Sequence, residues 1–322
     1  MAYTFSSTFA DSIQSFLDQK KALGFKYDRE RCILQNFDRF CITNFPSIDS
    51  LTDELCLAWA TKRENECNNS FLVRIAPLRE FARYLISKGD RAYIIPDIFG
   101  KPEAASPPYI YTEDEIYAIW DYLDHISPCS NSPFRHLTIP TMIKLLYCCG
   151  LRPCEARLLH VNDVDLNKGR LNIMDSKQRK SRIVMVADDV LEMLSEYNSA
   201  ITTVLPDRIA FFPSSNGGFY ERQCMKKPFR MAIQAAKITG SGGRFPRLYD
   251  FRHTFATHSL YRWMREGRDV SAMIPYLSSY MGHSLISDTY YYIHFVPGLF
   301  EELSGFDFSF AEKLLPEVNI DE

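Results

Sequence analysis

The chain has 322 residues, 46% of them hydrophobic, which is enough for about two domains with buried cores, and no apolar run reaches the ~18 residues that a membrane span needs. Its nine cysteines are odd in number and form no Cys-x-x-Cys motif, a pattern that favours reduced thiols in the cytoplasm over disulfides or a zinc site. The net charge of −3 conceals a basic middle: residues 135–284 carry 22 Lys or Arg against 13 Asp or Glu, which indicates a site for a polyanion unless these charges simply cover solvated faces.

The N-terminal part of the chain, residues 1–95, is predicted to form a helical domain. Apolar residues recur there at the spacing of one helical face in four stretches, residues 9–17, 32–41, 55–59 and 71–85. The last stretch is expected to end near Gly89. We therefore expect four or five packed helices.

Residues 96–110 are predicted to be a linker, because prolines and a glycine interrupt any helix there, at Pro96, Gly100, Pro102, Pro107 and Pro108. A second domain is expected over residues 111–304. Its first helix begins with a capping box in which Thr112 and Glu115 satisfy each other's backbone N–H groups.

The second domain is expected to be mostly helical with a small antiparallel sheet. A buried helix is predicted over residues 137–150, and two apolar runs, Leu171–Met174 and Ile183–Val186, flank a basic turn as in a β-hairpin. Further helices are expected to begin near Val190, Glu221, Asp250, Ser271 and Leu285. The fold class is thus mainly α, with residues 305–322 forming a C-terminal tail.

Two segments of this domain place cations where an anion could bind. Arg152 follows Gly150 at the junction between two predicted helices, although by itself it could simply pair with Glu155. The predicted hairpin turn carries four cations, Lys177, Arg179, Lys180 and Arg182. These charges repel one another unless a polyanion is present. Taken alone, the run would suggest only a solvated turn.

Two further segments concentrate polar aromatic side chains. Tyr249 and Arg252 lie on one predicted helix with His253 and His258, whose five-residue spacing does not suit a shared metal ion on one helix face. The other segment has His283 followed by three consecutive tyrosines, residues 290–292, which alone would suggest an aromatic core stripe.

In this order and spacing, the four segments resemble the tyrosine recombinase, or phage integrase, family over about residues 112–295. Gly-Leu-Arg-x-x-Glu-Ala at 150–156 resembles its first arginine box, and Ser-Lys-Gln-Arg-Lys-Ser-Arg at 176–182 its lysine hairpin. Tyr-Asp-Phe-Arg-His-Thr-Phe-Ala-Thr-His at 249–258 resembles the box with the second arginine. Gly-His-Ser at 282–284 and Ser-Asp-Thr-Tyr-Tyr-Tyr at 287–292 resemble the segment of the nucleophile, most closely in transposon-borne members. The N-terminal helices are similar to the family's core-binding domain in size and helicity.

The resemblance implies a site-specific recombinase that cleaves and rejoins DNA and needs neither metal nor cofactor. Arg152 and Arg252 would hold the oxygens of the scissile phosphate, for which a planar, permanently charged guanidinium is suited. Lys177 would protonate the 5′-oxygen leaving group, His283 would hydrogen-bond the phosphate, and Tyr292 would form a 3′-phosphotyrosyl bond. Arg179, Lys180 and Arg182 would contact DNA.

Tyr249 departs from the family pattern. The family has a histidine three residues before the second arginine, whereas a phenol, with a pKa near ~10, is a poor general base at neutral pH. Tyr249 is still counted among the catalytic residues, since its hydroxyl can hydrogen-bond the phosphate or orient the nucleophile. The identity of the base therefore remains open.

The resemblance also implies partners. These are double-stranded DNA at specific sites, a homotetramer on two such sites in which the tail of one copy docks on its neighbour, and other recombinases or DNA-bending accessory proteins. Two alternatives stay open at this point: a non-catalytic accessory relative that only binds DNA, and a type IB topoisomerase. Integration, transposition and chromosome maintenance are not distinguished by the sequence.

Overall fold

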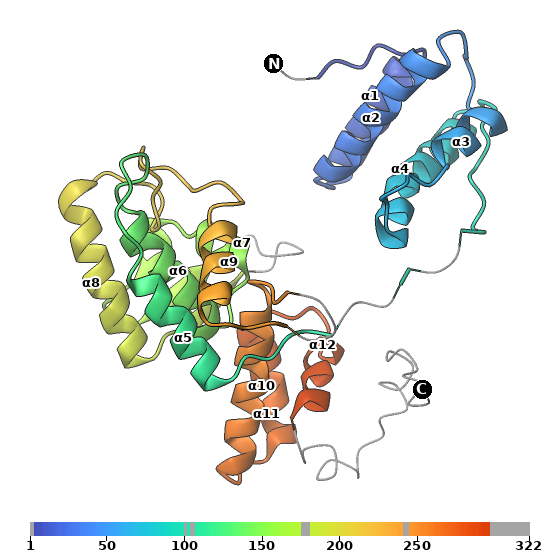
Figure 1. The fold of residues 1–322 in the computed structure, drawn as a ribbon. Coiled ribbons are helices and arrows are strands. Elements are labelled where there is room, and N and C mark those ends of the chain that lie inside the picture. The colour runs from blue at the N-terminus through green and yellow to red at the C-terminus, as the bar shows by residue number, and fades with distance from the viewer. Residues whose placement is uncertain (1–2, 100–101, 104–106, 175–180, 241–244, 297–322) are drawn as a thin grey trace. The chain divides into compact units, whose positions relative to one another are not determined.

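The computed structural model describes residues 3–99, 102–103, 107–174, 181–240 and 245–296, and it divides into two compact units, residues 1–105 and 106–322 (Figure 1). The described part of the first unit contains helices α1 (Ala10–Ala22), α2 (Asp28–Asn44), α3 (Asp53–Trp59) and α4 (Asn68–Ser87). None of the described helices in either unit is long and apolar enough to cross a membrane.

The core of the first unit is built from the helical faces that the spacing predicts. Ile13 and Phe16 of α1 are buried together with Phe37 of α2 and Phe81 of α4, and the rings of Phe16 and Phe81 lie 5.7 Å apart. Each of these side chains contributes about 2 kcal/mol through removal of apolar surface from water. Packing between helices, more than the propensity of any one helix, therefore stabilises this unit.

The second unit begins with the capping box that the sequence predicts. Thr112 Oγ1 accepts from the backbone N–H of Glu115 at 3.2 Å, and the Thr112 N–H donates to Glu115 Oε2 at 2.9 Å. The helices that follow are α5 (Glu113–Asp124), α6 (Arg135–Cys148), α7 (Pro153–Arg157), α8 (Asp188–Val204), α9 (Lys226–Ala235), α10 (Asp250–Arg265), α11 (Val270–Met281) and α12 (Ser287–Tyr290), with 3₁₀ turns η1 (Val161–Asp163) and η3 (Tyr291–Phe295).

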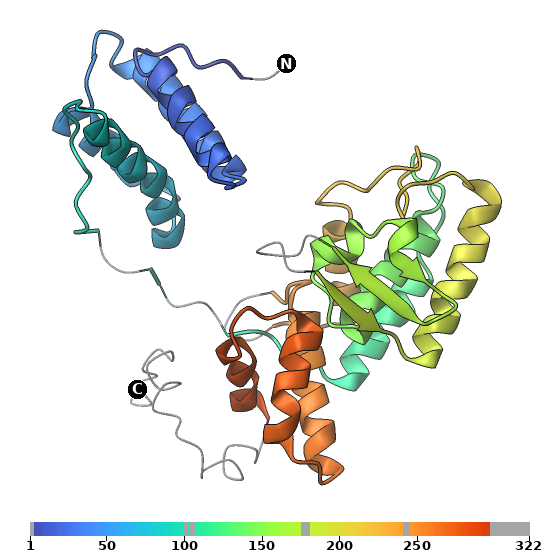
Figure 2. The same ribbon diagram turned by 180° about the vertical axis from the view of Figure 1, so that it is seen from behind.

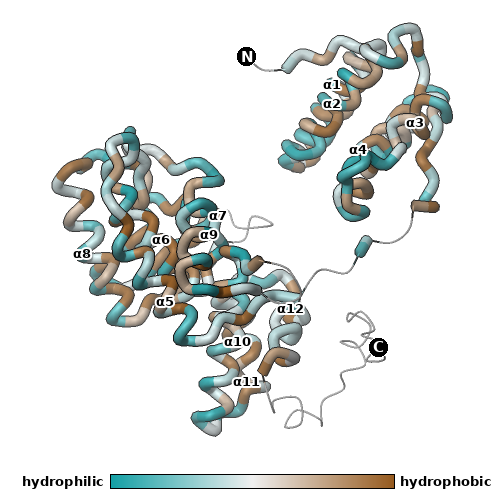
Figure 3. The backbone as a smooth tube through the Cα atoms, viewed as in Figure 1, coloured by the Kyte–Doolittle hydropathy of each residue, from teal (hydrophilic) through white to brown (hydrophobic). Residues whose placement is uncertain are grey.

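Helix α6 is the centre of this unit. Most of its side chains are buried, and Figure 3 shows hydrophobic colour along it. It packs against α5, α8 and α10, and the two residues after its end at Cys148, Cys149 and Gly150, are buried. Because Gly150 and Arg152 follow directly, the first arginine box starts at the end of a largely buried helix.

A small antiparallel sheet, seen in Figure 2, completes the unit with strand order β1 (Val164–Asp165), β2 (Arg170–Ile173), β3 (Arg182–Met185). The register pairs Leu171 with Val184 and Ile173 with Arg182. Since directly paired residues share a face and neighbours alternate between faces, Arg182 lies on the same face as buried Leu171 and Val184. Arg182, the first residue of β3, therefore points toward the core.

The predicted fold class is confirmed: the described chain is mainly α with a small antiparallel sheet. The predicted hairpin is present with each strand shifted by one residue, and β1 was not predicted, because two residues are too short to show a period. The helix expected near Glu221 begins instead at Lys226, with Pro228 in its first turn, where a missing N–H costs no helical hydrogen bond.

Candidate active site

Arg152 stands directly before α7 and is oriented by its own sequence neighbour. Its Nη1 donates to Glu155 Oε1 at 2.6 Å, and its backbone N–H donates to Glu155 Oε2 at 2.9 Å. The Nη2 group donates to the carbonyl oxygen of Gly282 at 3.1 Å. Burial would lower the pKa of Arg152, but the Glu155 carboxylate outweighs it and raises the pKa, so the guanidinium stays charged.

Arg252, on the first turn of α10, is buried with 0% of its surface exposed. Its two Nη groups donate to the carbonyl oxygens of Gly150 and Met281, each at 2.6 Å. Its Nε is buried and has no hydrogen-bond partner among the described residues. Burial, and then the charge of Arg152, lower the pKa of Arg252 to about 10, which still leaves it cationic at neutral pH.

The two arginines therefore converge on one point, the C-terminal end of α11, where Met281 and Gly282 supply consecutive carbonyl oxygens. Carbonyls at a helix C-terminus carry partial negative charge, which favours the two guanidinium groups. Gly282 caps this helix with φ +67°, and a Cβ there would lie 2.9 Å from Cδ of Arg182. Glycine is thus required both by the left-handed backbone and by the close approach of that side chain.

Glu155 lies between Arg152 and Arg182 and links the first arginine box to the sheet. Arg182 donates to both carboxylate oxygens, at 2.9 and 2.8 Å, and from Nε to the Tyr280 carbonyl at 2.8 Å. Burial alone would raise the pKa of Glu155, but the hydrogen bonds and charges of Arg182 and Arg152 lower it to about 2. Arg182 therefore fixes the position of Glu155, and Glu155 in turn orients Arg152. The run of cations in the sequence does not by itself indicate this role.

Tyr292, in η3, is the buried member of the tyrosine run, with 3% of its surface exposed. Its ring lies 5.9 Å from that of His283 at an interplanar angle of 24°, and its hydroxyl oxygen is 3.1 Å from Nδ1 of His253. Burial raises the pKa of Tyr292, and the charge of Arg252 opposes this effect. The phenol therefore contacts the residue that follows the second arginine, His253, and the residue that follows Gly282, His283.

His283 and Tyr249 flank this arrangement. Nδ1 of His283 is 2.7 Å from Oγ1 of Thr289, and burial, followed by the charges of Arg252 and Arg152, lowers the pKa of His283 to about 3. Its ring is therefore neutral at physiological pH. Tyr249 is 38% exposed at the start of α10, and its phenol is among the groups that raise the pKa of Arg152.

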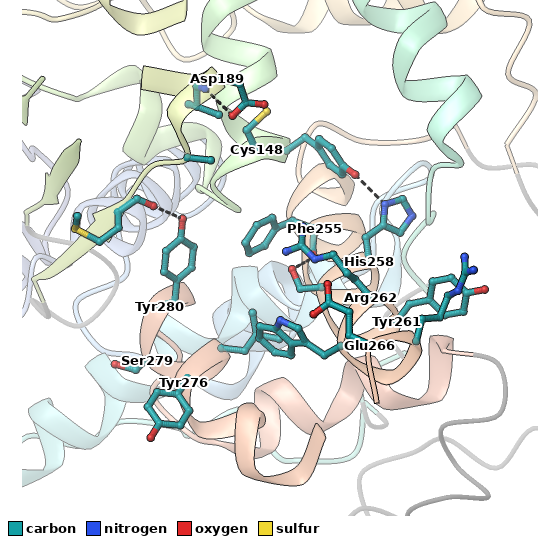
Figure 4. A pocket seen from close by; sticks show the side chains of 18 of the residues that line it. Cys148, Asp189, Phe255, His258, Tyr261, Arg262, Glu266, Tyr276, Ser279 and Tyr280 are labelled. Carbon is teal, nitrogen blue, oxygen red and sulfur yellow. Dashed lines mark hydrogen bonds between the residues drawn. The ribbon is translucent and has the colours of Figure 1, made fainter. Parts of the chain in front are cut away.

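The two histidines of α10 face different tyrosines. His253 approaches Tyr292, whereas Nδ1 of His258 is 2.9 Å from the hydroxyl oxygen of Tyr147, in a separate pocket lined by α6, β3, α10 and α11 (Figure 4). The two imidazoles thus share no ligand. Only His253 belongs to the candidate site. The sequence spacing of the two histidines does not show which of them contacts the tyrosine of the site.

Lys177, Arg179 and Lys180 lie outside the described residues. The strand ends that flank them are described: Ile173 pairs with Arg182, and Arg182 contacts Glu155. The described strand end at Arg182 therefore lies beside the first arginine box.

A further set of cations, not singled out from the sequence, surrounds a groove next to Arg152 and Tyr249. No acidic residue lines this groove within the described chain. The sequence does contain an indication of this groove, because Arg222, Lys226 and Arg230 follow one another at intervals of four residues, the spacing of one helical face. We call it the basic groove, lined by Arg152, Arg157, Arg222, Lys226, Arg230 and Arg247.

Comparison with known proteins identifies relatives along most of the chain. The family model described as the phage integrase family matches residues 110–297. The protein named "Putative integrase/recombinase y4rB" of Sinorhizobium fredii is 30% identical over 92% of this chain and 96% of its own. Tyrosine recombinase XerD of Rhizobium meliloti is 28% identical over 69% of this chain and 68% of its own. Among solved structures, a lambda integrase dimer bound to a core site shares the fold with a TM-score of 0.60 and 14% identity, covering 88% of this chain and 94% of that one.

Proposed function

The chain belongs to the phage integrase family of tyrosine recombinases, and we propose that it cleaves and rejoins DNA through a covalent bond between Tyr292 and a 3′-phosphate. The observation that carries this proposal is that two guanidinium groups meet on the carbonyls of Met281 and Gly282, while the buried phenol of Tyr292 contacts the residues that follow Arg252 and Gly282. Recombination at specific DNA sites, on behalf of a mobile element, is the overall activity that we propose.

In this proposal, Arg152 and Arg252 bind the non-bridging oxygens of the scissile phosphate. Tyr292 attacks phosphorus, Lys177 protonates the departing 5′-oxygen, and His283 donates a hydrogen bond to the phosphate. Negative charge builds up on the phosphoryl oxygens in the transition state, so fixed positive charge is worth more there than in the ground state. The covalent intermediate keeps the bond energy available for a DNA 5′-hydroxyl to reverse the attack.

Contact between DNA and Arg252 requires a rearrangement. Arg252 and Tyr292 are both buried, and the segment of α12 and η3, residues 287–295, carries Tyr292. We propose that binding of DNA shifts this segment enough for a phosphate to reach Nε of Arg252, the donor without a partner among the described residues, while the Tyr292 hydroxyl stays within reach of His253.

Trapping of the covalent complex tests the proposed function. A duplex is first selected by binding from a pool of randomised sequences, and a set of copies is then made with a single nick at successive positions. Cleavage next to a nick releases a short strand and leaves the protein attached to DNA. A protein–DNA adduct that survives denaturant supports a recombinase, whereas the absence of adduct at every position would leave only DNA binding. Relaxation of supercoiled DNA lacking the selected sequence would instead favour a topoisomerase.

We further propose that the basic groove binds the DNA backbone on the same side as the catalytic arginines. Lys226 and Arg230 lie on α9, are exposed, and line the groove, while the neighbouring Lys227 is exposed but does not line it. Phosphate contacts of this kind release counterions and therefore weaken as salt increases.

Replacing Lys226 with glutamine is expected to weaken binding and to lower the slope of log affinity against log salt by about 1, the value for one lost phosphate contact. Lys227→Gln is the matched control, with the same charge change on the same helix, and should leave the slope unchanged. The measurement is fluorescence anisotropy of the selected duplex over a range of salt concentrations. Equal slopes for both variants would contradict the assignment of the groove.

We also propose that four copies assemble on two DNA sites in the bacterial cytoplasm. The tail, residues 305–322, carries apolar residues among acids and lies outside the described residues. Removal of this tail should abolish the four-copy complex while one DNA site is still bound, as measured by light scattering with the selected duplex. A truncated chain that still forms the complex would rule out the tail as its contact.

A further inference from the structure

An imidazole other than the one expected from the family contacts the proposed nucleophile. Tyr249 occupies the position where the family resemblance places a histidine, and its ring lies against His253 with 5.1 Å between centroids. His253 follows Arg252 directly on α10. Its Nδ1 lies 3.1 Å from the hydroxyl oxygen of Tyr292, and the two ring centroids are 5.5 Å apart.

The other groups near Tyr292 are less suited to receive its proton. His283 stacks on the face of the phenol, but its Nδ1 is directed to Thr289. Tyr249 is itself a phenol and interacts with Arg152. Within the described chain, the hydrogen-bond partner found for the Tyr292 hydroxyl is His253.

The surroundings of His253 keep its imidazole neutral, so that Nδ1 has a free lone pair, and the same burial makes the ring a weaker base in the absence of DNA. Burial lowers the pKa of His253 to about 4; Asp250 opposes this shift, and the cations Arg247 and Arg252 add to it. A neutral ring protonated on Nε2 presents an unprotonated Nδ1 to the phenol. A DNA phosphate bound at the arginines would bring negative charge close to the imidazolium that forms and stabilise it.

We propose, building on the function proposed above, that His253 is the general base that accepts the phenolic proton of Tyr292. As the Oη–H bond breaks, the proton passes to Nδ1 and the oxygen forms a bond to phosphorus. The bond from phosphorus to the 5′-oxygen breaks, and that oxygen takes a proton from Lys177. In the rejoining step, the attacking 5′-hydroxyl gives its proton back to Lys177 and the imidazolium returns its proton to the phenol, so that no proton or electron is gained or lost over the cycle.

Replacing His253 with glutamine tests this role, because the amide can accept a hydrogen bond from Tyr292 but cannot take its proton. Cleavage of a nicked, selected duplex should slow by roughly 10²–10⁴-fold, the usual effect of losing a general base. DNA affinity should stay unchanged. His258→Gln is the matched control. His258 lies on α10 like His253 and also contacts a tyrosine hydroxyl, that of Tyr147, but in the separate pocket of Figure 4. This variant should cleave as fast as the wild type.

Two further measurements separate a base from a residue that merely holds Tyr292 in place. Imidazole added to His253→Ala should restore cleavage in proportion to its concentration. A substrate with sulfur in place of the 5′-oxygen, whose thiolate leaves without protonation, should rescue Lys177→Ala but not His253→Gln.

The proposal is overturned if His253→Gln cleaves as fast as the wild type, if imidazole fails to restore His253→Ala, or if the sulfur substrate rescues the His253 and Lys177 variants alike. Failure of the underlying function looks different, because the wild-type chain would then form no covalent adduct at all.

Discussion

Replacing Tyr292 with phenylalanine is expected to abolish the covalent protein–DNA adduct, with a loss of roughly 10⁴-fold or more in cleavage rate, because no other group takes over the bond to phosphorus. The substitution removes one oxygen from a buried ring and one contact, to His253, at a cost of about 1 kcal/mol. The fold and DNA binding should therefore persist. The measurement is adduct formation on the nicked duplex, with thermal unfolding and DNA affinity measured in parallel.

The neighbouring tyrosines provide the control for this prediction. Tyr290 and Tyr291 are partly exposed, whereas Tyr292 is buried against His253 and His283. Phenylalanine at position 290 or 291 should leave the adduct intact, and peptide mapping should place the DNA on Tyr292. An adduct that persists in Tyr292→Phe, or that maps to another tyrosine, would refute the assignment of the nucleophile.

Replacing Arg152 with alanine is expected to reduce the cleavage rate at saturating DNA by roughly 10³-fold or more, in line with the 10³–10⁵-fold contribution of a single arginine in phosphoryl transfer. Arg152 is a cleaner target than Arg252. Glu155 keeps two hydrogen bonds from Arg182 when Arg152 is removed, so no carboxylate is left buried without a partner. Removal of Arg252 would instead leave two buried carbonyl groups without their donors.

A variant of the basic groove distinguishes an arginine that binds DNA from an arginine that takes part in the reaction. Arg230→Ala removes an exposed cation from the basic groove, so it should weaken DNA affinity and leave the rate at saturating DNA unchanged. Arg152→Ala should show the opposite pattern, a large loss of rate with a small loss of affinity. Single-turnover cleavage measured over a range of protein concentrations distinguishes them. A rate within ten-fold of the wild type for Arg152→Ala would argue against its contact with the reacting phosphate.

Much of the architecture follows from local patterns in the sequence. The helical faces, the capping box at Thr112 and the hairpin strands depend on residues within a few positions of one another, and all are present in the structure. The segments that contain Arg152, Arg252 and Tyr292 were identified in the same way, by residue order and spacing. The structure then brings these three side chains to one place.

Other features depended on contacts that no local pattern contains. The family resemblance places Arg182 among the DNA contacts, yet the register of β3 turns its side chain inward to Glu155. In the sequence, nothing distinguishes His253 from His258 on the same predicted helix. Its importance comes from Tyr292, which reaches it from η3.

The sequence by itself determined which chemical groups the chain carries and which helix or strand holds each of them, since hydrophobic periodicity, capping and turn residues act over short separations. Only the tertiary structure decided which groups meet. The Arg252 guanidinium reaches the Gly150 carbonyl across 102 positions, and that of Arg152 reaches Gly282 across 130. Such meetings result from burial of the helices around a common core, and the free energy of that burial is spread over many side chains, so no short stretch of sequence records it.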